Sequence, residues 1–107
     1  MNKTIRIGCA SAFWGDTSSA AAQLVDSAGK DGGLDYLVFD YLAETTMAIL
    51  QRARLRTPEL GYATDFVSAA LKPNLRELKR RGVRLVSNAG GLNPAACRDA
   101  ILALARE

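Results

Sequence analysis

A short segment, Ser87–Pro94, has the residue types of a turn that binds an anion or a polarised oxygen. Gly90 and Gly91 permit positive φ angles and let a ligand approach the backbone closely. Asn93 suits the N-cap of a following helix, and Pro94 suits its first position. The free N–H groups of that helix start would point outward, where the helix dipole also favours negative charge. A tight strand-to-helix turn without a ligand uses the same residues, so other parts of the chain must decide between the two.

Two carboxylates, Asp40 and Glu44, are the candidates for moving a proton. Asp40 ends an apolar run, and Glu44 follows about one helical turn later, a spacing suited to a general acid and a general base. In the alternative interpretation, Asp40 caps the next helix and Glu44 complements its dipole. Asn88, just beyond a later apolar run, would add a neutral hydrogen-bond donor and acceptor beside them.

The aromatic pair Phe13 and Trp14 falls in a predicted loop, where it is costly to expose and could flank a planar or acyl group. Packing into the core is the alternative. Asp16, which follows Gly15, would occupy the position that a phosphate needs at the next helix start. Gly8 and Gly15 are also too far apart for a GxGxxG motif. The sequence therefore argues against NAD bound in the Rossmann manner.

Apolar runs that alternate with helical patterns are expected to position these groups. The expected strands are 4–10, 35–40 and 83–87, and the expected helices are 17–28, 43–55, 65–71, 73–81 and 94–105. Asp16 or Thr17 would cap the first helix and Asp65 the third, while Pro73 divides that third helix in two. The nearly continuous apolar centre of 35–40 is typical of a parallel sheet covered on both faces.

This alternation predicts an α/β fold in a single domain over 1–107, with Rossmann-like βαβ units, a parallel sheet of at least three strands, and helices on both faces. Both sheet edges would be open, so either a homo-oligomer or the remainder of a longer chain should cover them. Ligands bind beyond the carboxyl ends of such strands. The candidate ligand-binding residues there are Phe13, Trp14, Gly15 and Asp16 after the first strand, Tyr41 after the second, and Asn88, Gly90, Gly91 and Asn93 after the third.

Composition excludes several classes of function. The chain has no histidine, which removes Ser-His-Asp relays and histidine metal sites, and no metal site is expected. Its charge of +3 comes with no aromatic residues among the basic clusters, so nucleic-acid binding is not expected. Cys9 and Cys97 lack a CxxC context and predict reduced, partly buried thiols in place of a disulfide or a metal site, with Cys9 a small buried residue. No signal peptide or apolar run of membrane length is found, which favours a cytoplasmic protein that does not bind membranes.

Four segments together resemble the N-terminal region of the acyclic terpene utilisation (AtuA) family. They are Gly8–Asp16 (GCASAFWGD), Asp40–Glu44 (DYLAE), Gly61–Phe66 (GYATDF) and Ser87–Pro94 (SNAGGLNP). The last segment is the most specific, and the others agree in order and spacing. The resemblance spans nearly the whole chain.

The resemblance implies a cytoplasmic bacterial protein of citronellol or geraniol breakdown, a pathway whose intermediates travel as CoA thioesters. It also implies a chain that is the N-terminal portion of a longer one. Two interpretations follow. In the first, the protein binds or acts on a branched acyl-CoA, with Asn88, Gly90 and Gly91 holding the thioester oxygen or a phosphate and Asp40 or Glu44 moving a proton. In the second, it is a non-catalytic binding or assembly subunit of the same pathway. Neither interpretation names a cofactor.

Overall fold

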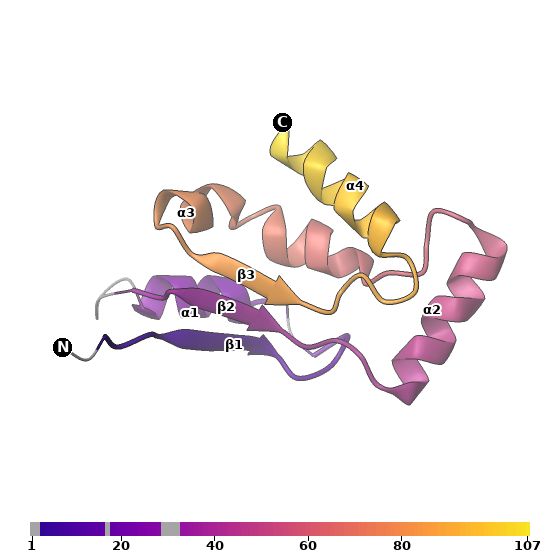
Figure 1. Ribbon diagram of the computed structural model, residues 1–107, viewed down its shortest axis with the longest axis horizontal. Coiled ribbons are helices and arrows are strands. Elements are labelled where there is room, and N and C mark those ends of the chain that lie inside the picture. The colour runs from indigo at the N-terminus through magenta and orange to yellow at the C-terminus, as the bar shows by residue number, and fades with distance from the viewer. Residues whose placement is uncertain (1–2, 17, 29–32) are drawn as a thin grey trace.

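The centre of the fold is a parallel sheet, and in the view of Figure 1 most helices lie above or behind it while one stands beyond the ends of the strands. The computed structural model describes residues 3–16, 18–28 and 33–107. Strands β1 (Ile7–Ser11), β2 (Tyr36–Phe39) and β3 (Arg84–Ser87) lie in that order, and both neighbouring pairs are parallel. Each strand ends within one residue of its predicted end. The predicted α/β class and three-stranded parallel sheet are therefore confirmed.

Two of the predicted helices have nearly the predicted bounds. Helix α2 covers Glu44–Arg56 and helix α4 covers Pro94–Ala105. At the start of α4 the Asn93 Oδ1 atom accepts a hydrogen bond from the Ala96 N–H (3.3 Å), which confirms the predicted cap. At the start of α2 the N-cap is Ala43, whose N–H donates to the Thr46 hydroxyl (2.6 Å). Asp40 therefore does not cap this helix.

The first helix differs from its prediction at its start. Helix α1 covers Ala20–Ala28, so it begins after position 17. The Asp16 carboxylate accepts a hydrogen bond from the Ala12 N–H (3.0 Å) and closes its own loop, so it does not cap α1. Thr17, the other predicted cap, lies outside the described residues.

The third helical segment divides at Pro73, as predicted. Its first piece, η1 (Phe66–Leu71), is a π-helix, and its second, α3 (Leu75–Arg80), is a short α-helix. The wider turn of η1 was not predicted. Asp65 does not cap η1 either, because its carboxylate accepts a hydrogen bond from the Trp14 indole N–H. A long-range contact has taken the place of the local one.

The two faces of the sheet are buried to very different degrees. The pairing places Gly8, Leu37 and Leu85 on one face and Cys9, Val38 and Val86 on the other. Leu37 is fully buried, whereas Val86 on the opposite face is 53% exposed. The expected helix cover is therefore present on only one face in the described part of the chain. Cys9 is exposed on the open face, contrary to the prediction, and Cys97 is buried as predicted.

The core lies between the covered face and the helices. Leu37 and Phe39 of the sheet pack there with residues from every covering helix, in a cluster that includes Ala21, Val25, Phe66, Ala70, Leu71, Leu78 and Cys97. Phe66 meets Phe39 edge-on, with ring centroids 5.0 Å apart. Because α1, η1, α3 and α4 share this single core, they hold the loops at the strand ends in fixed relative positions.

Candidate functional site

The loops after the three strands meet, as predicted, and Asn88 joins two of them. Its side-chain Oδ1 accepts a hydrogen bond from the Tyr41 N–H (2.8 Å), and its Nδ2 donates to Oδ1 of Asp40 (2.8 Å). Both ends of the amide are therefore engaged with the loop after β2. In this arrangement Asn88 orients the Asp40 carboxylate and fixes the distance between the ends of β2 and β3.

The two candidate proton carriers have different surroundings. Asp40 is exposed, and its Oδ1 also accepts a weak hydrogen bond from the Leu42 N–H (3.4 Å). Its second oxygen, Oδ2, accepts no hydrogen bond from the residues that the structure describes. Glu44 is the exposed first residue of α2, where its charge complements the helix dipole. Asp40 is thus the better positioned carboxylate, because a neighbouring amide holds it in place.

The loop after β1 packs against the loop after β2. The Trp14 N–H donates to the Tyr41 carbonyl (3.1 Å), and the Trp14 indole binds Asp65. Phe13 does not take part and is 52% exposed. Beside these residues lies a polar pocket of about 440 Å³, lined by Gly15, Asp16, Ser18, Tyr41, Asp65, Ala69 and Ala70. Its two carboxylates make it unsuitable for a phosphate or an acyl chain.

Tyr41 is the most perturbed group at the strand ends. Its buried ring packs against Phe39 and Phe66, with ring centroids 6.0 Å from each. Burial raises the pKa of its phenol to about 12, the Asp65 carboxylate adds to the rise, and a hydrogen bond with Ser11 opposes it. Tyr41 therefore stays protonated at neutral pH and acts as a hydrogen-bonding part of the core.

The glycine turn is filled by the protein itself. Gly91 has a φ of 53°, and a Cβ added there would lie 2.7 Å from Leu50 Cδ1 and 2.9 Å from the Gly61 carbonyl oxygen. The Leu92 N–H donates to that same carbonyl (2.9 Å). Asn93 uses its Nδ2 to bind the carbonyls of Pro58 (3.0 Å) and Leu60 (2.9 Å). These glycine and asparagine residues pack the turn against α2 and the loop that follows it.

An apolar cleft beneath α4 opens beside this turn. Its volume is about 400 Å³, within the range of small-molecule sites. The lining residues are Phe66, Leu71, Leu75, Leu85, Ser87, Ala89, Gly90, Pro94, Cys97, Arg98 and Ile101. Sequence reasoning missed this cleft. The apolar spacing of Cys97, Ile101 and Leu104 in α4 was a signal for it, but such spacing is also what a fully packed helix shows.

Comparison with known protein families shows the family to which this chain is related. The model of the acyclic terpene utilisation family protein AtuA matches residues 5–107. The chain belongs to the AtuA family. Membership links it to the utilisation of acyclic terpenes and confirms the resemblance seen in the four sequence segments. No curated protein and no solved structure matches the chain.

In this AtuA-family chain, Cys97 is a buried thiol that lines the cleft. Burial raises the pKa of its thiol, so the unreactive protonated form dominates at neutral pH. Burial and, to a smaller extent, the neighbouring Cys97 also raise the pKa of Tyr62. Cys97 therefore supplies an apolar wall to the cleft.

The described residues contain no cluster of three or more metal-ligating side chains. No helix among them has the length and apolar character needed to cross a membrane. The candidate site of this family member therefore consists of the Asp40–Asn88 pair, the glycine turn and the apolar cleft.

Proposed function

We propose that the protein binds the branched acyl group of a CoA thioester in the apolar cleft beneath α4. The observation that carries this proposal is the cleft itself, which adjoins Ser87 and Gly90 at the carboxyl end of β3. Family membership supports a branched apolar ligand, because it links the chain to acyclic terpenes. CoA thioesters are cytoplasmic metabolites, so the proposal also implies a cytoplasmic protein.

The chemistry of the cleft walls suits such a chain. Leucine, isoleucine, phenylalanine and proline side chains form most of the lining, and burial of each methylene group of a ligand contributes about 0.8 kcal/mol. Affinity should therefore fall about fourfold for each carbon removed from the acyl chain. A ligand without an apolar chain gains nothing from this cleft.

The polar end of the cleft offers a donor for the thioester oxygen. Ser87 Oγ accepts a hydrogen bond from the Ala89 N–H (3.0 Å), which orients this hydroxyl but leaves its O–H able to donate. The Gly90 N–H forms no hydrogen bond with the part of the chain that the structure describes. A thioester carbonyl lying beside Gly90 could accept that hydrogen bond, so of the residues predicted to hold the oxygen we retain Gly90.

A thermal-shift panel tests the binding proposal. Geranyl-CoA at about 100 times its dissociation constant should stabilise the native state by about 2.7 kcal/mol, which raises the melting temperature of a domain of this size by about 10–20 °C. Free CoA and NAD, which both lack the acyl chain, should each give a much smaller rise. Equal shifts with geranyl-CoA and CoA would contradict a site for the acyl chain.

If the protein is an enzyme, Asp40 is the residue that we expect to move a proton, because Asn88 orients its carboxylate at the strand ends. Asp40→Asn should then abolish turnover while geranyl-CoA binding changes little. Glu44→Gln is the matched control for loss of one exposed carboxylate at this end of the sheet. A wild-type rate in Asp40→Asn would exclude this catalytic role.

The open sheet face favours a second candidate function, that of an assembly subunit. Ile7 is 65% exposed and Val86 53% exposed on that face, and nearby Ile5 is 54% exposed. Contiguous exposed apolar residues mark surfaces that bind other proteins. Under this interpretation Val86→Glu should weaken association, measured by sedimentation, and no CoA compound should raise the melting temperature.

A further inference from the structure

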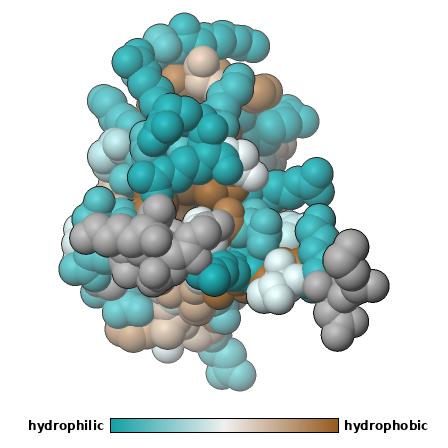
Figure 2. Space-filling view, turned by 90° about the vertical axis from the view of Figure 1, so that its left-hand side faces the viewer, coloured by the Kyte–Doolittle hydropathy of each residue, from teal (hydrophilic) through white to brown (hydrophobic). Residues whose placement is uncertain are grey.

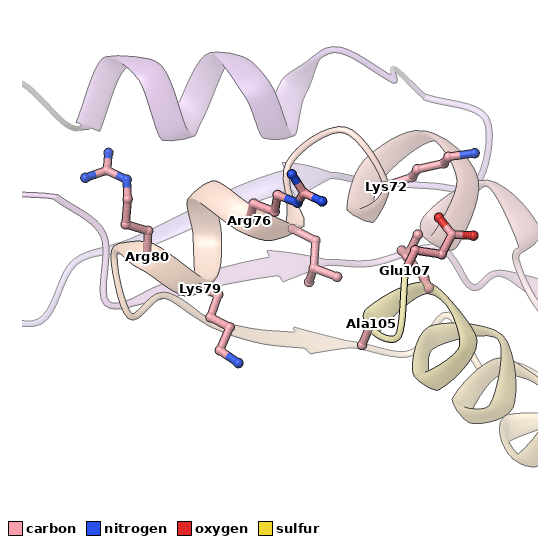
Figure 3. A pocket seen from close by; sticks show the side chains of 8 residues that line it. Lys72, Arg76, Lys79, Arg80, Ala105 and Glu107 are labelled. Atoms are coloured by element: carbon pink, nitrogen blue, oxygen red, sulfur yellow. The ribbon is translucent and has the colours of Figure 1, made fainter.

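A second groove lies between α3 and the C-terminal end of α4, and Figure 3 shows its lining side chains. Its volume is about 740 Å³. The lining residues are Lys72, Leu75, Arg76, Lys79, Arg80, Leu104, Ala105 and Glu107. Seen from the end of the molecule that carries α3, hydrophilic residues gather over the upper half, with hydrophobic atoms visible between them (Figure 2). We call this feature the basic groove.

The charge of the basic groove is concentrated and of one sign. Four of its residues are cations and one is a carboxylate, so it carries as much net positive charge as the whole chain, +3. Arg76, Lys79 and Arg80 recur at helical spacing in α3, and Lys72 lies in the turn between η1 and α3. Like charges at this spacing repel one another, so helix stability alone does not account for the arrangement.

Most of these cations are not neutralised by neighbouring side chains. Arg80 binds Glu77, and Glu77 also accepts a hydrogen bond from Arg81 (2.6 Å); these two bonds lower the pKa of Glu77 to about 2. Lys72, Arg76 and Lys79 form no ion pair with any described residue. An anion in the groove would therefore meet three available cations without displacing an existing partner.

The positions of Lys72 and Arg76 also indicate that the charge of the groove is not explained by helix stability. Lys79 and Arg80 lie in the last turn of α3, where positive charge complements the helix dipole. Lys72 and Arg76 lie before the helix and in its first turn, where the dipole disfavours them. Both nevertheless line the groove, together with Leu104 and Ala105 of α4.

The basic groove and the apolar cleft share a lining residue. Leu75 lines both, and α4 supplies a wall to each, with Ile101 in the cleft and Leu104 in the groove. The 12 residues of α4 span about 18 Å, so one elongated ligand could lie along the helix from Gly90 to Ala105. Its apolar end would lie in the cleft and its anionic end among the cations.

We propose that the basic groove binds the phosphate groups of a nucleotide-type ligand. The identification of this ligand as the anionic end of a CoA thioester rests on the proposed function. The groove itself requires only multiply charged phosphate, because Arg76 presents a guanidinium fork and Lys72 and Lys79 present point charges.

The experiment compares two charge-matched double variants by isothermal titration calorimetry. Arg76→Gln with Lys79→Gln removes two charges from the groove, and Arg52→Gln with Arg56→Gln removes two from α2, outside it. Each protein is titrated with adenosine 3′,5′-bisphosphate, with geranyl-CoA, and with the geranyl thioester of N-acetylcysteamine, which lacks phosphate. Unchanged melting temperatures establish that both variants fold.

The groove variant should lose roughly tenfold or more in affinity for the bisphosphate and for geranyl-CoA, whereas the α2 variant should keep both affinities. The N-acetylcysteamine thioester should bind all three proteins alike. Equal affinities of the two variants for the bisphosphate would overturn the proposal. A different result would separate the two proposals. If the wild-type protein does not bind the N-acetylcysteamine thioester, but bisphosphate binding still falls in the groove variant, the phosphate site in the groove is supported and the proposed acyl site is contradicted.

Discussion

The glycine turn and the cleft beneath α4 lie side by side but differ in what fills them. At the turn, a Cβ added to Gly91 would lie within 3 Å of Leu50 and of the Gly61 carbonyl, and Asn93 binds two carbonyls of the preceding loop. In the cleft, the side chains of η1, β3 and α4 leave a volume of about 400 Å³. The residues that look most functional in the sequence thus serve protein packing, and residues that look like ordinary core surround the space for a ligand.

This difference shows what glycine at a strand end can mean. Positive φ and close backbone approach are required whether the approaching group is a ligand or another loop of the same protein. At Gly91 the approaching group is the protein itself. The packed turn still contributes to the site, because it fixes Gly90 at the mouth of the cleft.

The largest effect is expected from a methyl group placed in the packed turn. Gly91→Ala suffers both the strain of a positive φ and a contact of 2.7 Å with Leu50, whereas Gly82→Ala, at a φ of 69°, meets nothing within 4 Å. Both variants should lose about 1–2 kcal/mol of unfolding free energy from strain. Gly91→Ala should lose about 1–3 kcal/mol more from overpacking. Urea denaturation measures both, and equal losses would mean that the turn is not closely packed.

The next largest effect concerns the ionisation of Tyr41, whose N–H is bound to Asn88. An unfolded tyrosine ionises near pH 10 and the folded one near 12, so the folded state binds more protons in this window. The stabilising contribution is complete below pH 10 and is lost as the pH rises to 12, by about 2–3 kcal/mol. Denaturation at several alkaline pH values should show a steeper decline in the wild type than in Tyr41→Phe. Parallel declines would rule out a buried phenol.

A smaller effect is expected where Asn88 joins the loops. Asn88→Ala removes hydrogen bonds to the Tyr41 N–H and to Asp40 and should cost about 1–3 kcal/mol of unfolding free energy. Asn74→Ala, which removes one hydrogen bond to the Ala70 carbonyl (2.8 Å), is the control at a distant site. A loss in Asn88→Ala no greater than in Asn74→Ala would show that the Asn88 amide does not link the strands.

The sequence predicted the strands and helices better than it predicted which face of the sheet the helices cover. The β-branched runs defined the three strands, Pro73 divided the third helix, and Asn93 with Pro94 set the start of α4. The open sheet face could not be predicted, because the apolar run 35–40 has the same composition whether a helix or solvent lies over it. The exposure of Cys9 follows from that same open face.

The convergence of the strand-end loops was predicted, but most of the contacts between them were not. Convergence of the loops followed from parallel strands alone, and Asp40, Tyr41 and Asn88 do meet. The roles of Asp16 and Asp65 could not be predicted, because each takes a hydrogen bond that depends on how loops fold back on one another. The cleft and the basic groove are spaces between helices, and their volumes depend on packing that no local pattern encodes.

The most direct test of the account fills the cleft from α4. Ile101 lines the cleft, whereas its neighbour Leu102 is 45% exposed and outside it, so Ile101→Phe and Leu102→Phe add similar volume on different faces of one helix. Calorimetric titration with geranyl-CoA should show that Ile101→Phe lowers affinity at least about tenfold, because the phenyl ring takes the space of several methylene groups of the ligand. Leu102→Phe should bind like the wild type. Unchanged affinity in a folded Ile101→Phe protein would contradict the claim that the cleft beneath α4 is the binding site.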